Sequence, residues 1–292
     1  MDLRQLRYFI VLAEEGQISR AAKKLNMSQP PLSQQLQMME EELGVTLLER
    51  KKHGRSMKLT EPGRVLYEKA RSLLQNFEDS MHEVKETGEG VRGNLLIGSV
   101  LAYVSYLPQK IKMFKEKNPS VEIKLFAGDP TLVQDYLEKQ DIELAIVYLP
   151  VELEGLSIKK LDQVPNVFVV PESWGEFQST EKIKLEEIGN SPLVMLHRTK
   201  GTGIFDEIIK EFSERGIEPN VLCKCPDVNV LLSLVSAGIG ASIVPKSAVP
   251  PYMSHKVRVL EIKDSLVHSN VALVWKKERY LSKATQQFIE LF

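Results

Sequence analysis

The sequence predicts a multidomain protein of the α+β class, with a small helical domain, then one long helix, then an α/β domain of two subdomains. Three observations support this organisation. Apolar side chains in residues 18–43 recur at helical spacing with one short interruption, and residues 62–85 keep a single helical pattern. From residue 94 onward, strand-like and helix-like segments alternate, which is typical of an open, largely parallel sheet.

Residues 18–43 predict two short helices joined by a tight turn. The apolar stripe of the first helix consists of Ile18, Ala21, Ala22 and Leu25. Its two alanines leave room for another helix to approach closely. The pattern stops at residues 26–28, where Ser28 is a good N-cap for the second helix. Pro30 then falls in the first turn, where its missing N–H costs nothing.

The second helix has two different faces. The face predicted to be buried carries Leu32, Leu36, Met39 and Leu43, and the opposite face carries Gln29, Ser33, Gln34 and Gln37. Hydroxyl and amide groups can donate to and accept from base edges and phosphates. The alternative is an ordinary solvated surface helix, but such a face usually mixes lysine and glutamate. Here the acids Glu40, Glu41 and Glu42 come only at the far end, where a helix docked by its N-terminus leaves the groove.

A basic hairpin follows at residues 46–60. Strand-like pieces at 47–48 and 57–59 flank a turn centred on His53 and Gly54. Its basic side chains are Arg50, Lys51, Lys52, Arg55 and Lys58. Residues 50–71 contain eight basic and two acidic side chains, a local charge of +6, whereas the whole chain has a formal charge of −1. This concentration of charge predicts phosphate contacts beside a DNA-reading helix.

Residues 1–60 resemble the winged helix-turn-helix of LysR-type transcriptional regulators. The resemblance is carried by Leu-Arg-Gln-Leu-Arg-Tyr-Phe at 3–9, Ser-Gln-Pro-Pro-Leu-Ser at 28–33, Leu-Leu-Glu-Arg at 47–50 and Leu-Thr-Glu-Pro-Gly at 59–63. One departure is Gln34, which stands where many members carry arginine. We therefore expect contacts to double-stranded DNA, at an inverted-repeat operator, from Ser28, Gln29, Pro30, Ser33, Gln34, Gln37, Arg50, Lys52 and Arg55.

The long helix carries apolar residues at steps of four and three, close to the heptad spacing of paired helices. These residues are Leu66, Ala70, Leu73, Phe77, Met81 and Val84. A helix lying on its own domain is the alternative. The resemblance implies instead a linker helix that pairs across a homodimer, with two dimers assembling into a homotetramer through their C-terminal domains. Residues 87–93 contain three glycines and predict a hinge.

The C-terminal part repeats a strand–helix pattern twice and then returns to its first half. Strands are expected at 95–100, 121–126, 143–147, 167–170, 193–196, 220–225, 241–245, 257–262 and 271–275, and helices at 107–117, 131–139, 203–215, 228–237 and 281–291. This resembles the effector-binding domain of LysR-type regulators, which is similar to periplasmic solute-binding proteins. The expected domains are 1–60 (DNA-binding), 61–87 (linker helix), 88–93 (hinge) and 94–292, with subdomain I at 94–163 and 268–292 and subdomain II at 164–267.

A ligand between two such subdomains would lie where strands end and helices begin, because helix N-terminal N–H groups favour carboxylates. The candidate effector-binding residues are Ser99, Val100, Gly128, Asp129, Thr131, Tyr148, His197, Arg198, Lys200, Gly201, Thr202 and Ile204. Hydroxyls, cations and glycines in the 197–203 loop favour an organic anion. The alternative is that Ser99 or Thr202 merely caps a helix and the cations are solvated. Asp129 departs from the family, whose members often carry a neutral hydroxyl there.

Composition favours a cytoplasmic regulator with no membrane partner. The chain has 292 residues, 43% hydrophobic and 26% charged, and no stretch approaches the length of a membrane span. Cys223 and Cys225 lie two apart on one strand, which is poor disulfide geometry, and no histidines accompany them. They are expected to be reduced and structural, and no cofactor or metal is expected.

An effector-responsive regulator has two alternatives, an enzyme and a DNA-binding protein without an effector. The glycines fit neither a P-loop nor the dinucleotide fingerprint, no nucleophile elbow occurs, and the five histidines are scattered, so an enzyme is not expected. A DNA-binding protein whose C-terminal domain serves only oligomerisation or protein contact is the second alternative. Within the family, the pattern is most similar to the branch that senses aromatic-degradation metabolites. The effector is therefore expected to be small and to carry a carboxylate. RNA polymerase is a candidate partner, and activator and repressor both remain open.

Overall fold

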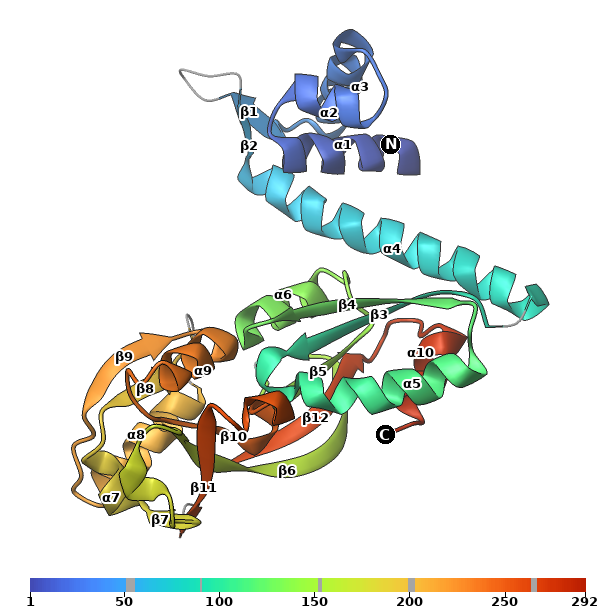
Figure 1. Ribbon diagram of the computed structural model, residues 1–292. Helices are drawn as coiled ribbons and strands as arrows, with labels where there is room; N and C mark the ends of the chain where they lie inside the picture. Colours follow the sequence, from blue (N-terminus) through green and yellow to red (C-terminus); the bar gives the residue numbers. More distant parts are fainter. Residues whose placement is uncertain (51–55, 90, 152–153, 199–202, 264–266) are drawn as a thin grey trace. The chain divides into compact units, whose positions relative to one another are not determined.

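The computed structural model describes residues 1–50, 56–89, 91–151, 154–198, 203–263 and 267–292 (Figure 1). For Arg50 and part of the end of the long helix it describes the backbone only. The chain forms two compact units, Met1–Gly88 and Glu89–Phe292.

The N-terminal unit is a helical bundle with one short hairpin. Its elements are α1 (Leu3–Glu15), α2 (Ile18–Lys24), α3 (Gln29–Leu43), β1 (Leu48–Arg50), β2 (Met57–Leu59) and α4 (Glu61–Glu89). The two strands are antiparallel, with Leu48 opposite Leu59 and Arg50 opposite Met57. The helix–turn–helix and the hairpin predicted from the sequence are both present.

The core of this unit is formed by the apolar faces predicted for α2 and α3. The fully or nearly fully buried side chains include Leu6, Phe9, Leu12, Ala21, Ala22, Leu32, Leu36 and Met39. The prediction that Leu43 is buried is wrong, because it ends α3 beyond the core and is 41% exposed. Ser28 has N-cap backbone geometry, as predicted, but its side chain makes no capping hydrogen bond.

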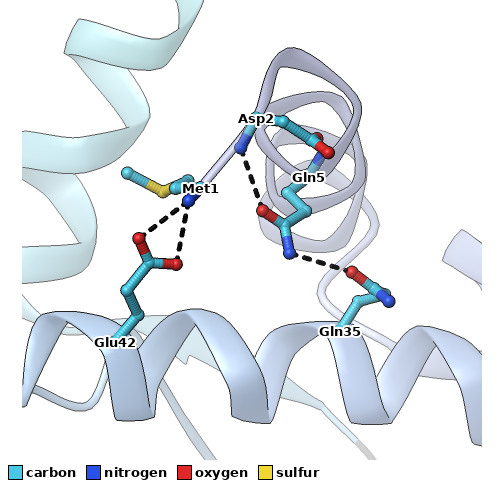
Figure 2. Close-up of polar contacts among 5 residues, drawn as sticks. All are labelled: Met1, Asp2, Gln5, Gln35 and Glu42. Carbon is cyan, nitrogen blue, oxygen red and sulfur yellow. Dashed lines mark hydrogen bonds and ion pairs between the residues drawn. The ribbon is translucent and has the colours of Figure 1, made fainter.

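Polar contacts join the start of α1 to α3 (Figure 2). Asp2 and Gln5 form a capping box, in which the Gln5 N–H donates to Asp2 Oδ1 at 2.8 Å and the Asp2 N–H donates to Gln5 Oε1 at 2.9 Å. Gln5 Nε2 then donates to Gln35 Oε1 at 3.1 Å. The amino group of Met1 lies 2.7 Å and 2.9 Å from the two carboxylate oxygens of Glu42. Since most of these groups are exposed, the contacts contribute little to stability. They help to fix the orientation of α3 relative to α1.

The apolar face of α4 changes its surroundings along the helix. Ala70 and Leu74 are buried in the core of the N-terminal unit, and Leu66 packs against it. Four side chains further along the predicted stripe are exposed, namely Leu73 (55%), Phe77 (42%), Met81 (45%) and Val84 (67%). The interpretation of the whole stripe as a pairing surface is therefore wrong at Ala70, which packs on its own unit, and only the later part is uncovered within this chain.

The C-terminal unit alternates strands and helices. Its strands are β3 (Gly93–Val100), β4 (Val121–Gly128), β5 (Leu144–Leu149), β6 (Leu156–Pro171), β7 (Lys182–Lys184), β8 (Leu193–Leu196), β9 (Val221–Cys225), β10 (Ser242–Pro245), β11 (Val257–Lys263) and β12 (His268–Lys276). Its α-helices are α5 (Leu107–Lys117), α6 (Pro130–Glu138), α7 (Leu185–Gly189), α8 (Ile204–Glu214), α9 (Val228–Ser236) and α10 (Lys283–Ile289). A 3-10 helix, η1, spans Leu101–Tyr106.

Strand β6 connects the two halves of this unit. Its first part pairs with β12 in a sheet of order β4-β3-β5-β12-β6, and its last part pairs with β10 and β11. Figure 1 shows α6 on one side of the first sheet and α5 with α10 on the other. The unit has two hydrophobic clusters: one is centred on β3, β5 and β12 and extends through α9 into the second half, and the other contains Phe168, Met195 and Phe212.

The fold class predicted from the sequence is confirmed, with two corrections. The sheets are less parallel than expected, because β12 and β6 run antiparallel to each other and β12 runs antiparallel to β5. The predicted strand at 167–170 is only the end of β6, which has 16 residues. Its first part alternates apolar residues with Lys159, Lys160 and Asp162, so it lacks a continuous apolar run. Strand β7 and helix α7 were not predicted.

Candidate functional site

The polar face of α3 is open to solvent. Ser28, Gln29, Pro30, Gln34 and Gln37 are exposed and Ser33 is half-buried, while the side chains behind them pack in the core. This arrangement places the amide and hydroxyl groups on one surface along the first turns of the helix. A helix presented by its N-terminal half can enter a major groove, where amides read base edges.

The acidic end of α3 makes contacts within the unit. Glu40 accepts hydrogen bonds from the backbone of the hairpin, and Glu42 pairs with the amino group of Met1. Gln37 Nε2 donates to Glu41 Oε1 at 2.8 Å. The acids are therefore grouped at the end of α3 that follows the polar face.

The structure describes only part of the DNA-binding site predicted for the hairpin. Lys51, Lys52 and Arg55 lie outside the described residues, and so does the side chain of Arg50. Lys58 is exposed on β2, opposite Glu49 on β1. The hairpin nevertheless begins a few residues after α3, and hydrogen bonds from Leu47 and Leu48 to Glu40 join its start to the end of that helix.

A second candidate site is a cleft between the two halves of the C-terminal unit. Seven of the predicted effector residues line it: Val100, Gly128, Asp129, Tyr148, His197, Arg198 and Ile204. They come from the ends of β3, β4, β5 and β8 and from the start of α8, as the sequence argument required. The structure thus brings together residues that are up to about a hundred positions apart in the chain.

Two described residues of the prediction, Ser99 and Thr131, do not line the cleft. Ser99 is buried in β3, where its hydroxyl donates to the Val100 carbonyl at 3.0 Å. Thr131 lies in the first turn of α6 and is not part of the cleft wall. Lys200, Gly201 and Thr202 lie outside the described residues.

Aromatic and cationic groups meet at the centre of the cleft. The Arg198 guanidinium carbon lies 4.7 Å from the centre of the Tyr148 ring, and the two residues belong to opposite halves of the unit. Burial raises the pKa of the Tyr148 phenol, while Arg198 and a hydrogen bond from the backbone of Ile204 oppose this rise. Burial also raises the pKa of Tyr103, so both phenols are neutral near pH 7. Tyr148 therefore connects β5 to the start of α8.

Two carboxylates already occupy helix N-termini at the cleft. Asp129 caps α6 by accepting from the Leu132 N–H at 3.0 Å. Asp206 accepts from the Gly203 N–H at 2.7 Å at the start of α8. The acid at position 129, where family members often carry a neutral hydroxyl, thus has a structural explanation, because Asp129 stabilises α6 as its N-cap. An effector anion would need Arg198 in addition to helix N–H groups.

The cleft is narrow as it stands. It encloses a cavity of about 40 Å³. This holds a few water molecules at most, whereas pockets for small organic ligands occupy roughly 300–1,000 Å³. A bound aromatic acid would therefore have to separate the walls.

Sequence reasoning missed part of the lining. The additional residues are Leu101, Ala102, Tyr103, Pro130, Leu196, Pro226, Val228 and Pro245. Most are apolar, and Tyr103 belongs to a 3-10 helix that has no helical apolar stripe. Pro226 and Pro245 could have been found, since each stands at the end of a strand, where the other candidates were sought.

The described residues offer neither a metal site nor a membrane-spanning helix. They contain no group of histidine, cysteine and acidic side chains arranged to hold a metal ion. No described helix is both long and apolar enough to cross a bilayer. Cys223 is exposed, Cys225 is buried, and neither forms a disulfide.

Comparison with known proteins gives the family. Residues 3–64 match the bacterial regulatory helix-turn-helix protein of the lysR family, and residues 88–292 match the LysR substrate binding domain. The chain is 37% identical to the HTH-type transcriptional regulator BsdA of Bacillus subtilis (strain 168) over all 292 residues of this chain and the whole of that protein. It is 34% identical to AlsR of the same organism, over 85% of this chain and 82% of that one.

The chain belongs to the LysR family of transcriptional regulators. A crystal structure of full-length CbnR with its target DNA aligns over 100% of this chain and 98% of that one, with a TM-score of 0.76 and 28% identity. A structure of CbnR alone aligns with a TM-score of 0.73 and 27% identity over the same shares. The resemblance found in the sequence is confirmed.

This LysR-type regulator is a DNA-binding transcriptional regulator with a substrate-binding domain. The match over residues 88–292 therefore favours the effector-binding interpretation over a domain that serves oligomerisation alone. The family consists of transcriptional regulators rather than enzymes.

The contact between Tyr148 and the start of α8 generates a prediction. Tyr148→Phe keeps the ring on Arg198 but removes the hydroxyl that faces the Ile204 backbone. We expect a loss of about 1 kcal/mol in the free energy of unfolding of the C-terminal unit, together with faster amide exchange at Ile204. Denaturant unfolding and hydrogen exchange measure the two effects.

Tyr252→Phe is the control, since Tyr252 is 72% exposed and outside the cleft. Equal behaviour of the two variants would mean that the Tyr148 hydroxyl does not join the two halves.

Proposed function

We propose that this regulator reads the bases of its operator with the exposed face of α3, while the basic side chains of the hairpin bind the adjacent phosphates. The observation that carries this proposal is the solvent-exposed row of Gln29, Gln34 and Gln37 on a helix whose opposite face is buried. Amides can pair with adenine in two hydrogen bonds, which makes them base-specific. The cluster of positive charge in residues 50–71 supplies the sequence-independent part of the affinity.

Replacement of Gln29 tests the reading of bases. An operator is first selected from a pool of random-sequence duplexes with the wild-type protein. Gln29→Ala should then bind this operator more weakly by about 1–3 kcal/mol and should relax the base preference at one position of each half-site. Fluorescence anisotropy and a repeated selection measure both effects.

Gln178→Ala, an exposed glutamine of the C-terminal unit, serves as the control. Unchanged affinity and unchanged base preference in Gln29→Ala would place base recognition elsewhere.

The regulator is proposed to act as a homodimer through α4 and as a homotetramer through additional contacts of the C-terminal units. In support, Leu73, Phe77, Met81 and Val84 lie on one face of α4 and are 42–67% exposed. Their steps of four, four and three suit the packing of two helices along each other. A dimer with two reading helices would recognise an inverted repeat, because operator symmetry mirrors protein symmetry.

A charge on this face tests the assembly. Leu73→Asp should place a carboxylate between the paired α4 helices and so disrupt the dimer contact. The contact between C-terminal units should remain. The mass of the assembly in sedimentation equilibrium at micromolar concentration should therefore fall by half. Val65→Asp is the matched control, since Val65 is 54% exposed on the same helix but lies about 80° away around its axis. A monomeric wild-type protein, or a variant with wild-type mass, would contradict the proposal.

The effector is proposed to be a small organic acid with an aromatic or other apolar body, bound in the cleft. The apolar wall suits such a body, and Arg198 supplies the charge for its carboxylate. Because the cavity is small, binding would separate the two halves and change the Tyr148 contact with α8. A ligand shifts such an equilibrium only by its differential affinity for the two states, which is typically about 1–3 kcal/mol.

A further inference from the structure

Glu40 differs from its acidic neighbours at the end of α3. Its side chain is half-buried, and its Oε1 accepts hydrogen bonds from the backbone N–H groups of Leu47 at 2.7 Å and Leu48 at 3.2 Å. The Glu40 carbonyl also accepts from the N–H groups of Gly44, at the C-cap of α3, and of Val45. One residue therefore satisfies four backbone donors between the end of α3 and the start of β1.

The same peptide segment is held from its other side by the start of α4. The Leu47 carbonyl accepts from the Thr60 N–H at 3.0 Å and from the Thr60 hydroxyl at 3.1 Å. The Gly63 N–H donates to the Thr60 hydroxyl oxygen at 3.0 Å. A Cβ at Gly63 would lie 2.0 Å from the Leu47 carbonyl oxygen, so α4 approaches this segment as closely as glycine allows.

The side chains of the segment are equally constrained. Leu47 is 1% exposed and Leu48 is 7% exposed, both within the core of the N-terminal unit. The direction in which β1 and β2 leave the core is thus set at Leu47 and Leu48, and Glu40 is the group through which α3 fixes it. Buried backbone donors that lose their acceptor are costly, which gives this carboxylate a structural task that its exposed neighbours lack.

We propose that Glu40 is a positioning residue for DNA binding. It fixes the hairpin relative to α3, so that the polar face of α3 and the basic side chains of the hairpin meet one duplex together. This inference rests on the phosphate contacts proposed above for the hairpin. Electrostatics alone predicts the opposite effect, because an acid near DNA repels the phosphates and its removal should strengthen binding.

The test uses the full-length protein and mixed-sequence double-stranded DNA, for which phosphate contacts supply the affinity. Three variants are compared with the wild type: Glu40→Ala removes the acceptor, Glu40→Gln keeps an acceptor without the charge, and Glu41→Ala removes the same charge from the next, exposed position. The affinity is measured over a series of salt concentrations. Hydrogen exchange at Leu47 and Leu48 is measured without DNA.

We expect Glu40→Ala to speed exchange at Leu47 and Leu48 about tenfold, and to weaken DNA binding about tenfold with a flatter salt dependence. Glu40→Gln should retain most of the exchange protection and bind DNA at least as tightly as the wild type. Glu41→Ala should leave exchange unchanged and bind DNA as tightly as the wild type or more tightly. Exchange at core amides such as that of Leu32 confirms that each variant is folded.

Two results would overturn the proposal. If Glu40→Ala keeps wild-type exchange at Leu47 and Leu48, the carboxylate does not hold the hairpin. If exchange rises but DNA binding is unchanged or stronger, Glu40 holds the hairpin without serving DNA binding. A failure of the phosphate contacts themselves is recognised with Lys52→Ala: intact contacts predict weaker binding to mixed-sequence DNA with a flatter salt dependence, whereas wild-type affinity and salt dependence in this variant would mean that the proposed contacts are absent.

Discussion

The C-terminal unit depends on the path of β6, a single strand of 16 residues that belongs to both of its halves. Its first part is paired with β12 from Leu156 to Pro165, and its last part is paired with β10 and β11 from Asn166 to Pro171. At the change between these pairings, Asn166 is 5% exposed and its Nδ2 donates to the Val267 carbonyl at 2.8 Å, next to the start of β12. The two crossing segments are therefore joined here by a side-chain hydrogen bond, next to the backbone pairing of His268 with Pro165.

This connection supports the proposal that the cleft responds to a ligand. Lobes that are joined by short crossing segments can rotate about those segments when a ligand binds between them. Tyr148 contacts Arg198 and the start of α8, and so links the two halves at the cleft. Under the proposal, a ligand that replaces these contacts would change the angle between the halves.

In the N-terminal unit, the framework fixes the position of the hairpin relative to the polar face of α3. Helix α3 is positioned by apolar packing and by its contacts with the start of α1, while the hairpin is positioned by Glu40 and Thr60. The described side chains that face solvent in the first half of α3 lie outside this framework. Under the proposal, these residues serve recognition without loss of stability.

The sequence predicted most of the fold because its signals were local. Apolar spacing placed α3 and α5 within a residue of their observed bounds. The search for polar residues at strand ends found seven of the residues that line the cleft. The failures arose where tertiary contacts decide. The burial of Ala70 depends on packing within the unit, the first part of β6 alternates charged with apolar residues, and Ser99 turns its hydroxyl to its own backbone. Likewise, the capping roles of Asp129 and Asp206 follow from geometry that residue type alone does not reveal.

We propose that a carboxylate-bearing ligand binds between the two halves of the C-terminal unit, where Arg198 holds its carboxylate. The most direct measurement is calorimetric titration of the full-length protein and of its Arg198→Gln variant with a set of aromatic carboxylates and the corresponding amides. We predict that a carboxylate of the set binds the wild-type protein, that its amide does not, and that the variant binds that carboxylate at least tenfold more weakly because the charge-assisted hydrogen bonds are lost. Equal binding of the acid and its amide, or undiminished binding by Arg198→Gln, would contradict the account.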